Sequence, residues 1–220
     1  MTTHTFEIAR HDLMVELRAK ETLTVVVPFG LAALIALPMA IGIDLPLISR
    51  IGPAAYWSTA LLFGMQIAWR QTVADAGPHR DLITLLGVSP VSRFWGRTAA
   101  SAVLLIAFML LLGVAAVLLF SPDVRISPWL LVITLLFGAG LAVVSTLAAD
   151  ITTGLSGRSP LASVLVVPLA LPLLVGAAQG VESLSRGSGI LPWLLMLAAV
   201  EIVLAVAGTL AARPLEEAAR

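Results

Sequence analysis

Long apolar stretches separated by short polar segments dominate the pattern of this chain. A helix rises about 1.5 Å per residue and the hydrocarbon core of a bilayer is roughly 30 Å thick, so about 20 apolar residues can cross it. The stretches show continuous apolarity instead of the alternation typical of barrel strands. We therefore predict an all-α integral membrane protein with six transmembrane helices. They lie at about Thr22–Ile43, Ile51–Arg70, Thr98–Phe120, Pro128–Ala149, Pro160–Gln179 and Ile190–Ala212.

The composition excludes a soluble fold. The chain of 220 residues is 59% hydrophobic and only 12% charged, and its mean hydropathy is +1.02. A water-soluble domain of this size needs a polar surface that these residues cannot supply. There is no cysteine, which excludes disulfides, thiolate metal sites and thiol catalysis. The first apolar stretch is too long for the core of a cleavable signal peptide, so we predict none.

The basic residues are distributed unevenly between the polar segments. If both termini are cytoplasmic, ten Lys and Arg residues lie on the inner side and three on the outer side. Lys and Arg concentrate in cytoplasmic loops, so this distribution predicts that both termini are cytoplasmic. Trp57, Trp129 and Trp193 are then expected near the outer interface, and Trp69 and Trp95 near the inner one. The inner set is Arg10, Arg18, Lys20, Arg70, Arg80, Arg93, Arg97, Arg158, Arg213 and Arg220, and the outer set is Arg50, Arg125 and Arg186.

Residues 1–21 form a separate amphipathic segment before the first apolar stretch. Phe6, Ala9, Leu13 and Leu17 recur at helical spacing over three turns, with charged residues largely off that stripe. The segment is either a simple positive anchor or an elbow helix lying in the membrane surface, and the spacing favours the elbow helix. We expect a six-helix transmembrane domain over residues 22–212 and a short cytoplasmic tail over residues 213–220.

The polar segment from Arg70 to Arg97 is the largest cytoplasmic loop of this arrangement. Gly77-Pro78 is expected to break the helix that leaves the second span. A short helix should follow and end at Ser89-Pro90, and Ser92–Arg97 should turn the chain into the third span. Leu82, Leu85 and Leu86 fall on one face of that helix. The helix either snorkels in the lipid headgroups or docks into a groove of a cytosolic partner.

The order of residues from Gly77 to Arg97 resembles the cytoplasmic loop of ABC-2-type transporter permeases. The matching positions are Gly77, Leu82, Leu85, Leu86, Pro90, Ser92, Gly96 and Arg97. That family often has a glutamate three residues after the glycine, where this chain has Arg80 followed by Asp81. The resemblance implies that a separate ATPase subunit docks on this coupling helix and on the N-terminal helix. The implied coupling residues are Gly77, Arg80, Asp81, Leu82, Leu85, Leu86 and Pro90.

A second resemblance covers nearly the whole chain. The fifth apolar stretch, with its proline pair, and the run IGPAAYWSTALL at Ile51–Leu62 are similar to the CcmB family, the heme-exporter B subunit of cytochrome c maturation. This implies a permease subunit of the bacterial inner membrane, two copies of which work with an ATPase and a heme-handling membrane subunit. The alternatives are an ABC-2 permease for a lipid, drug or polyketide, and a membrane scaffold or enzyme that needs no ATPase.

Two features inside the apolar stretches are candidates for function. Pro168 and Pro172 each remove a backbone hydrogen bond, so the fifth helix should be kinked, either for gating or as a tolerated packing feature. Glu201 is the only ionisable residue well inside a stretch, and burying it costs about 2.5–3.5 kcal/mol on insertion scales. It should face the bundle, a cavity or a subunit interface. It is either a proton or substrate contact, or a packed, protonated side chain hydrogen-bonded to a neighbour.

The residue inventory offers no chemistry of its own. Small residues in the third, fourth and sixth stretches, such as Gly138 and Gly140, permit close helix packing. All three histidines fall on the cytoplasmic side, and the possible outer heme ligands, Met39 and Tyr56, have no histidine beside them. The phosphate loop GxxxxGK[ST] is absent, as are a catalytic triad and a metal-ligand cluster at membrane depth. We expect no enzymatic activity and no metal or cofactor in this chain, with ATP bound by a partner subunit and heme either transported or held by a partner.

Overall fold

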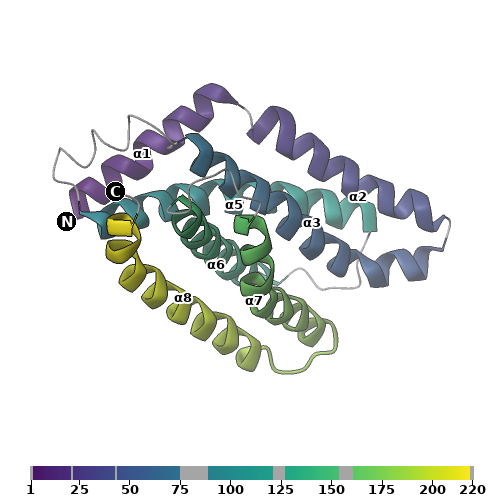
Figure 1. The fold of residues 1–220 in the computed structure, drawn as a ribbon. Helices are drawn as coiled ribbons and strands as arrows, with labels where there is room; N and C mark the ends of the chain where they lie inside the picture. The colour runs from purple at the N-terminus through teal and green to yellow at the C-terminus, as the bar shows by residue number, and fades with distance from the viewer. Residues whose placement is uncertain are drawn as a thin grey trace.

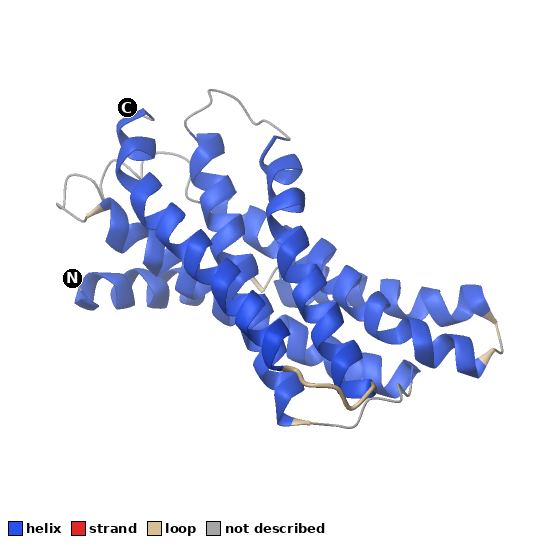
Figure 2. Cartoon of the chain, turned by 90° about the horizontal axis from the view of Figure 1, so that it is seen from below, coloured by secondary structure: helices blue, strands red, loops and turns tan. Residues whose placement is uncertain are grey.

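In the computed structural model, residues 2–20, 22–42, 44–74, 89–120, 127–153 and 161–218 are described, and all their secondary structure is helical. The predicted all-α class is therefore confirmed over these residues. The helices pack side by side, and the start of α1 and the end of α8 lie at the same end of the bundle (Figures 1 and 2). In chain order they are α1 (Thr2–Ala19), the π-helical turn η1 (Thr22–Val26), α2 (Val27–Ile41), α3 (Leu45–Ala74), α5 (Pro90–Phe120), α6 (Pro128–Thr153), α7 (Leu161–Ser185) and α8 (Leu191–Ala218).

Five of these segments are long and apolar enough to cross a membrane. They coincide with five of the six predicted spans, and the remaining prediction, Ile51–Arg70, falls on α3. This helix has 30 residues but is less apolar, because it carries polar side chains such as Tyr56, Thr59 and Gln66. The five segments are Thr24–Ile41, Pro90–Phe120, Pro128–Ile151, Val166–Ser185 and Leu191–Pro214.

The structure corrects the predicted boundaries of the cytoplasmic loop. Helix α3 continues to Ala74, and α5 begins at Pro90 instead of Thr98. The expectation that Ser92–Arg97 form a turn is therefore wrong, because these residues belong to the first turns of α5. The predicted loop Arg70–Arg97 is thus helical at both ends, and residues 75–88 lie outside the described ranges. The reason is that Ser89-Pro90 marks the start of α5.

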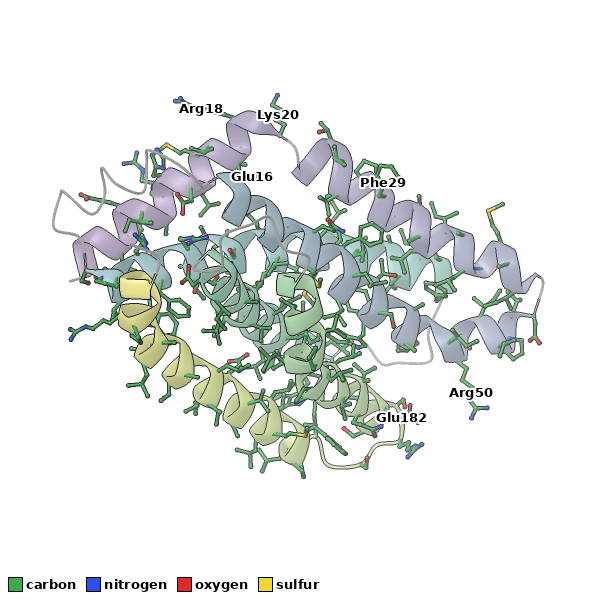
Figure 3. The ribbon with its side chains drawn as sticks, in the orientation of Figure 1. Glu16, Arg18, Lys20, Phe29, Arg50 and Glu182 are labelled. Atoms are coloured by element: carbon green, nitrogen blue, oxygen red, sulfur yellow. The ribbon has the colours of Figure 1, made fainter. Side chains whose placement is uncertain are left out.

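Helix α5 lies at the centre of the arrangement. It contacts α1, α2, α3, α6 and α8, whereas α7 packs mainly on α6, α8 and α3 (Figure 1). Its buried side chains include Leu105, Phe108, Met109 and Leu112, which are fully or almost fully inaccessible. By contrast, α2 and α8 expose apolar side chains along their outer faces, such as Phe29, Ile35, Ile202 and Leu210 (Figure 3 labels Phe29). In a membrane these outer faces contact lipid.

Glycines receive the bulky side chains of α5 and its neighbours. A Cβ atom built on Gly52 would lie 2.6 Å from Cβ of Phe120, and one on Gly138 would lie 2.9 Å from Cγ1 of Ile106. Lipid chains are as apolar as the side chains, so helices associate in lipid mainly through van der Waals contact. Small residues strengthen this contact because they let the helix backbones approach closely. The expected role of these glycines in internal packing is supported. The pairs involving α5 are Gly30 with Phe108, Gly52 with Phe120, Gly64 with Leu105, Gly138 with Ile106, Gly208 with Phe94, and Gly96 with Ile8.

Gly208→Leu should destabilise the bundle by about 1–3 kcal/mol, because the added side chain enters the space that the ring of Phe94 fills. Ala207→Leu is the matched control, since Ala207 is exposed and directly precedes Gly208. This substitution should change stability by less than about 0.5 kcal/mol. Thermal unfolding of the purified chain in detergent measures both. Equal melting temperatures for the two variants would contradict the packing described for α5 and α8.

Candidate functional site

The start of α5 is fixed by a serine cap. The backbone N–H of Ser92 donates to Oγ of Ser89 at 3.2 Å, and the two serine hydroxyls lie 2.7 Å apart. Serine is a favoured N-cap residue, and proline suits the next position because its missing N–H would have no helical partner there. Pro90 is thus the first residue of a continuous helix. Any force applied to the chain before Ser89 acts directly on a helix that crosses the bundle.

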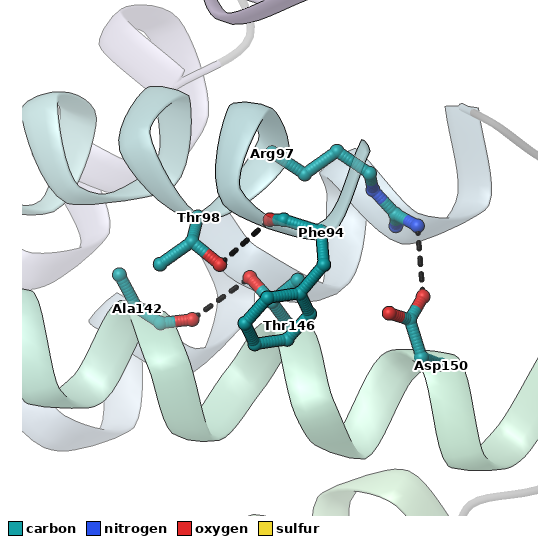
Figure 4. Close-up of polar contacts among 6 residues, drawn as sticks. All are labelled: Phe94, Arg97, Thr98, Ala142, Thr146 and Asp150. Carbon is teal, nitrogen blue, oxygen red and sulfur yellow. Dashed lines mark hydrogen bonds and ion pairs between the residues drawn. The ribbon is translucent and has the colours of Figure 1, made fainter. Parts of the chain in front are cut away.

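About two helical turns further on, a buried ion pair joins α5 to α6. Nη1 of Arg97 lies 3.0 Å from Oδ1 of Asp150, and the two side chains are only 9% and 16% exposed (Figure 4). A charged hydrogen bond in such a poorly hydrated place is strong, and each partner depends on the other. The start of α5 and the end of α6 are therefore locked together on one side of the bundle.

The residues around this ion pair also contact α1 and α8. Phe94 packs against Gly208 of α8, and Gly96 lies against Ile8 and the backbone oxygen of Thr5 in α1. Thr98 donates to the backbone oxygen of Phe94 at 2.9 Å, so its hydroxyl is satisfied within the helix (Figure 4). We call Ser89–Thr98 the α5 entry segment. It contacts α1, α6 and α8 within three turns, which makes it the candidate site for transmitting movement into the bundle.

Most of the predicted coupling residues lie outside the described residues. Of that set only Pro90 is described, and it opens α5. The coupling helix itself therefore stays a prediction from the sequence. The six coupling residues that fall in the undescribed range 75–88 are Gly77, Arg80, Asp81, Leu82, Leu85 and Leu86.

The predicted proline pair lies inside α7, which is helical from Leu161 to Ser185. Pro168 is exposed and Pro172 is half-buried, so the two prolines differ in their surroundings. Each lacks the N–H that would bond to the preceding turn, which weakens the helix between them. A hinge at this place stays a prediction.

Glu201 lies on α8 and faces α6. A Cβ built on Gly140 would be 3.2 Å from Cγ of Glu201, so the absence of a side chain at Gly140 makes room for the carboxyl group. Its Oε1 atom is buried and, among the described residues, has no hydrogen-bond partner. A buried acceptor without a donor is costly. The sequence prediction that Glu201 faces the bundle is consistent with this contact.

Tyr56 and Trp57 of α3 both have partners on neighbouring helices. Trp57 is buried, with its ring 5.0 Å from that of Phe137, so it packs inside the bundle and not toward the headgroups as the belt pattern suggested. Tyr56 donates its hydroxyl to the backbone oxygen of Met109 at 3.0 Å. That bond joins α3 to α5 and occupies the hydroxyl of one candidate heme ligand. The other, Met39, is highly exposed near the end of α2.

The sequence matches a known protein family over nearly its whole length. A family model described as CcmB protein matches residues 3–216, which cover all or nearly all of every helix described above. The chain belongs to the CcmB family. The match is not confined to the cytoplasmic loop, since it extends from α1 through α8.

Individual relatives agree with the family match. Heme exporter protein B of Haemophilus influenzae is 30% identical over 186 residues, which is 80% of each chain. The protein of the same name from Bradyrhizobium diazoefficiens is 31% identical over 183 residues, or 79% of this chain and 80% of the relative. Heme exporter protein B of Paracoccus denitrificans is 28% identical over 216 residues, or 94% of both chains. The CcmB fold is thus shared along most of the sequence.

Sequence reasoning missed the ion pair of this CcmB chain. The predicted third span, Thr98–Phe120, begins directly after Arg97, and the predicted fourth span, Pro128–Ala149, ends directly before Asp150. Both lie at the same predicted membrane face, at the ends of spans that follow each other in the chain. The sequence could therefore have predicted that Arg97 and Asp150 lie close together, because consecutive antiparallel helices bring such ends side by side.

Removing one partner of the Arg97–Asp150 pair should cost about 3–5 kcal/mol, because it leaves a poorly hydrated charge without its counter-charge. Arg97→Met and Asp150→Leu should each lower the melting temperature of the purified chain. The double variant should recover most of the loss, and a double-mutant cycle measures the coupling.

The exposed pair Arg186–Glu182, at 2.7 Å, is the matched control. Arg186→Met should change stability by less than about 1 kcal/mol, since exposed ion pairs contribute little. Additive effects of Arg97→Met and Asp150→Leu would show that the two residues do not stabilise each other.

Glu201→Leu should raise the stability of the purified chain by about 1–3 kcal/mol, because it removes a buried oxygen that has no donor among the described residues. Ile202→Leu, at an exposed neighbouring position, is the control and should be neutral within about 0.5 kcal/mol. The measurement is again thermal unfolding in detergent. A lower melting temperature for Glu201→Leu would show that the carboxyl group has a stabilising partner.

Proposed function

We propose that this chain is the transmembrane permease subunit of an ABC transporter that acts in heme export for the biogenesis of c-type cytochromes. The observation that carries the proposal is the CcmB match over residues 3–216. The relatives named Heme exporter protein B support the substrate. The chain is a multi-pass protein of the bacterial inner membrane, and it works with a second copy of itself and a heme-handling membrane subunit.

In this proposal α3 is the sixth transmembrane helix. Its 30 residues give a length of about 45 Å, which is more than a bilayer core requires. Two of its polar side chains face protein, since Thr59 is buried and Tyr56 donates to the backbone oxygen of Met109. Six crossings place both termini on one side, which agrees with the common end of α1 and α8 in Figure 1.

Both termini are cytoplasmic in this topology, and α1 is the elbow helix. The excess of Lys and Arg in the segments on that side supports the orientation. The contact between Ile8 and Gly96 supports a role for α1 in holding the α5 entry segment. The Arg97–Asp150 pair then lies at the cytoplasmic end of the bundle.

ATP hydrolysis belongs to a separate subunit, since the chain has no phosphate loop. That subunit docks on the coupling helix before Ser89. Its closure moves the α5 entry segment, and the movement reaches α1, α6 and α8 through Gly96, the Arg97–Asp150 pair and Phe94. The proline pair of α7 supplies the hinge at which the outer half of the bundle responds.

Leu82→Asp combined with Leu86→Asp should abolish copurification of the ATPase subunit, because a charged face cannot enter an apolar docking groove. Maturation of c-type cytochromes in a deletion strain should fall at least about tenfold, as expected when a docking helix loses its anchor residues. The measurements are affinity purification from native membranes and heme staining of the c-type cytochromes.

Thr84→Asp is the matched control, since Thr84 is predicted on the opposite face of the same helix. It should leave both readouts at the wild-type level. Full cytochrome maturation by the double leucine variant, with no ATPase subunit attached to the wild-type chain, would contradict the transporter proposal.

A further inference from the structure

Helix α1 turns two of its three acidic residues, Asp12 and Glu16, toward the bundle. Ala9 is buried, and Ile8 lies against Gly96 of α5. Asp12 and Glu16 are half-buried on this side of the helix, and Asp12 lies 3.5 Å from the ring of His11. The inner face of α1 therefore carries acidic residues beside Ile8 and Ala9, which suits a contact with the arginine-containing α5 entry segment.

The outer face of α1 has the opposite character. Phe6 is 70% exposed and Leu17 is 56% exposed, and they lie almost one above the other at helical spacing. Arg10 and Arg18 are exposed beside them, and Lys20 follows at the end of the helix. Figure 3 shows Arg18 and Lys20 pointing away from the rest of the molecule. Glu7 is the one acidic residue of α1 that is exposed, so cations prevail on this face.

Water is a poor environment for such a face. An exposed stripe containing Phe6, Met14 and Leu17 indicates an interaction surface, since soluble proteins rarely leave such side chains clustered in water. An apolar stripe flanked by Arg and Lys is typical of a helix that lies in a membrane interface. The apolar side chains enter the acyl region and the cations stay with the headgroups.

The path of the chain into α2 places this face at the lipid boundary. Lys20 adopts a left-handed conformation, with φ of 53°, and its N–H donates to the backbone oxygen of Glu16 at 2.8 Å. Its own oxygen accepts from the N–H of Thr24 at 2.9 Å and from the hydroxyl of the same residue at 2.8 Å. This bonded turn leads through η1, where Val25 is exposed, into α2, where Phe29 is exposed. The outer face of α1 thus continues into the lipid-facing side of a transmembrane helix.

We propose that the outer face of α1, formed by Phe6, Leu17 and the cations Arg10, Arg18 and Lys20, binds the anionic phospholipid surface of the inner leaflet. The proposal rests on the proposed function for the membrane topology. It assigns the face to lipid and not to the ATPase subunit. Anionic headgroups are the complementary partner, because juxtamembrane Lys and Arg are attracted to a negative lipid surface.

The test uses the full chain in lipid nanodiscs. The chain has no cysteine, so a single Leu17→Cys variant takes one fluorescent label. The nanodiscs contain phosphatidylcholine and phosphatidylglycerol, with bromine atoms on the acyl chains of one or the other at the same mole fraction. Bromine quenches a fluorophore on contact. We expect quenching by both lipids, and about threefold or stronger quenching when the phosphatidylglycerol is brominated.

Two charge variants identify the source of the preference. The triple variant Arg10→Gln, Arg18→Gln, Lys20→Gln should quench equally with either brominated lipid. The matched control Arg50→Gln, Arg186→Gln, Arg213→Gln removes three exposed cations elsewhere and should keep the preference. Equal quenching by both lipids in the Leu17→Cys chain, or a preference that survives loss of the α1 cations, would overturn the proposal.

A label at Phe29→Cys on α2 separates this proposal from the proposed function. Both brominated lipids should quench it, because Phe29 lies on the outer side of a transmembrane helix. If Phe29→Cys is quenched and Leu17→Cys is not, the chain spans the membrane but α1 does not lie on lipid, and the inference fails alone. Shielding of Leu17→Cys from aqueous iodide by the added ATPase subunit would then identify that subunit as the occupant. An unquenched Phe29→Cys would overturn the membrane topology itself.

Discussion

Close packing of bulky side chains against glycine holds this bundle together, and α5 is the helix on which it converges. Phe94, Phe108 and Phe120 lie along one helix and meet glycines of α8, α2 and α3. Association in lipid gains little from excluding apolar surface, because lipid is itself apolar, so contact area must supply the attraction. A ring placed on a glycine gives a large contact area at a short distance between helix axes. The same geometry couples the helices, since α5 cannot shift without disturbing a contact on each neighbour.

The ion pair Arg97–Asp150 is the polar counterpart of this packing. It lies where α5 and α6 reach one end of the bundle, so the charges avoid the middle of the membrane and still escape most of the solvent. A pair of this kind contributes specificity more than net stability, because desolvation offsets much of the attraction. Its position beside Phe94 and Gly96 joins the charged contact to the apolar ones. Displacement at Ser89 is therefore shared by α1, α6 and α8 and is not absorbed by a local turn.

The helices and their order could be predicted because apolar runs of about 20 residues have few other stable forms in lipid. Their ends could not, as Pro90 illustrates. Ser-Pro follows many helices and also begins many, and the bond from Ser92 to Ser89 identifies Pro90 as the first residue of α5. Trp57 was expected at an interface, but it is buried in the bundle. The sequence pattern of a single helix does not show which of its faces meets a neighbouring helix. The partner of Arg97 lies 53 residues away, so it depends on which helices are neighbours. The coupling helix is predicted from sequence resemblance alone, because residues 75–88 lie outside the described ranges.

In the proposed arrangement, the two faces of α1 connect the membrane surface to the α5 entry segment. A soluble amphipathic helix buries its apolar face, but α1 packs Ile8 and Ala9 with Asp12 and Glu16 against the bundle and exposes Phe6 and Leu17. Exposed apolar side chains of this size are stable where a second apolar medium covers the outer face. With lipid on one side and Gly96 on the other, α1 would resist movement of the α5 entry segment across the membrane plane more than movement within it. Force from an ATPase subunit would then be converted into a lateral shift or rotation of α5 about its own contacts, instead of a piston movement. The contacts between the phenylalanine rings of α5 and the glycines of α2, α3 and α8 also favour a lateral shift or rotation. Sliding α5 along its axis would push each phenylalanine ring against the next turn of the facing helix.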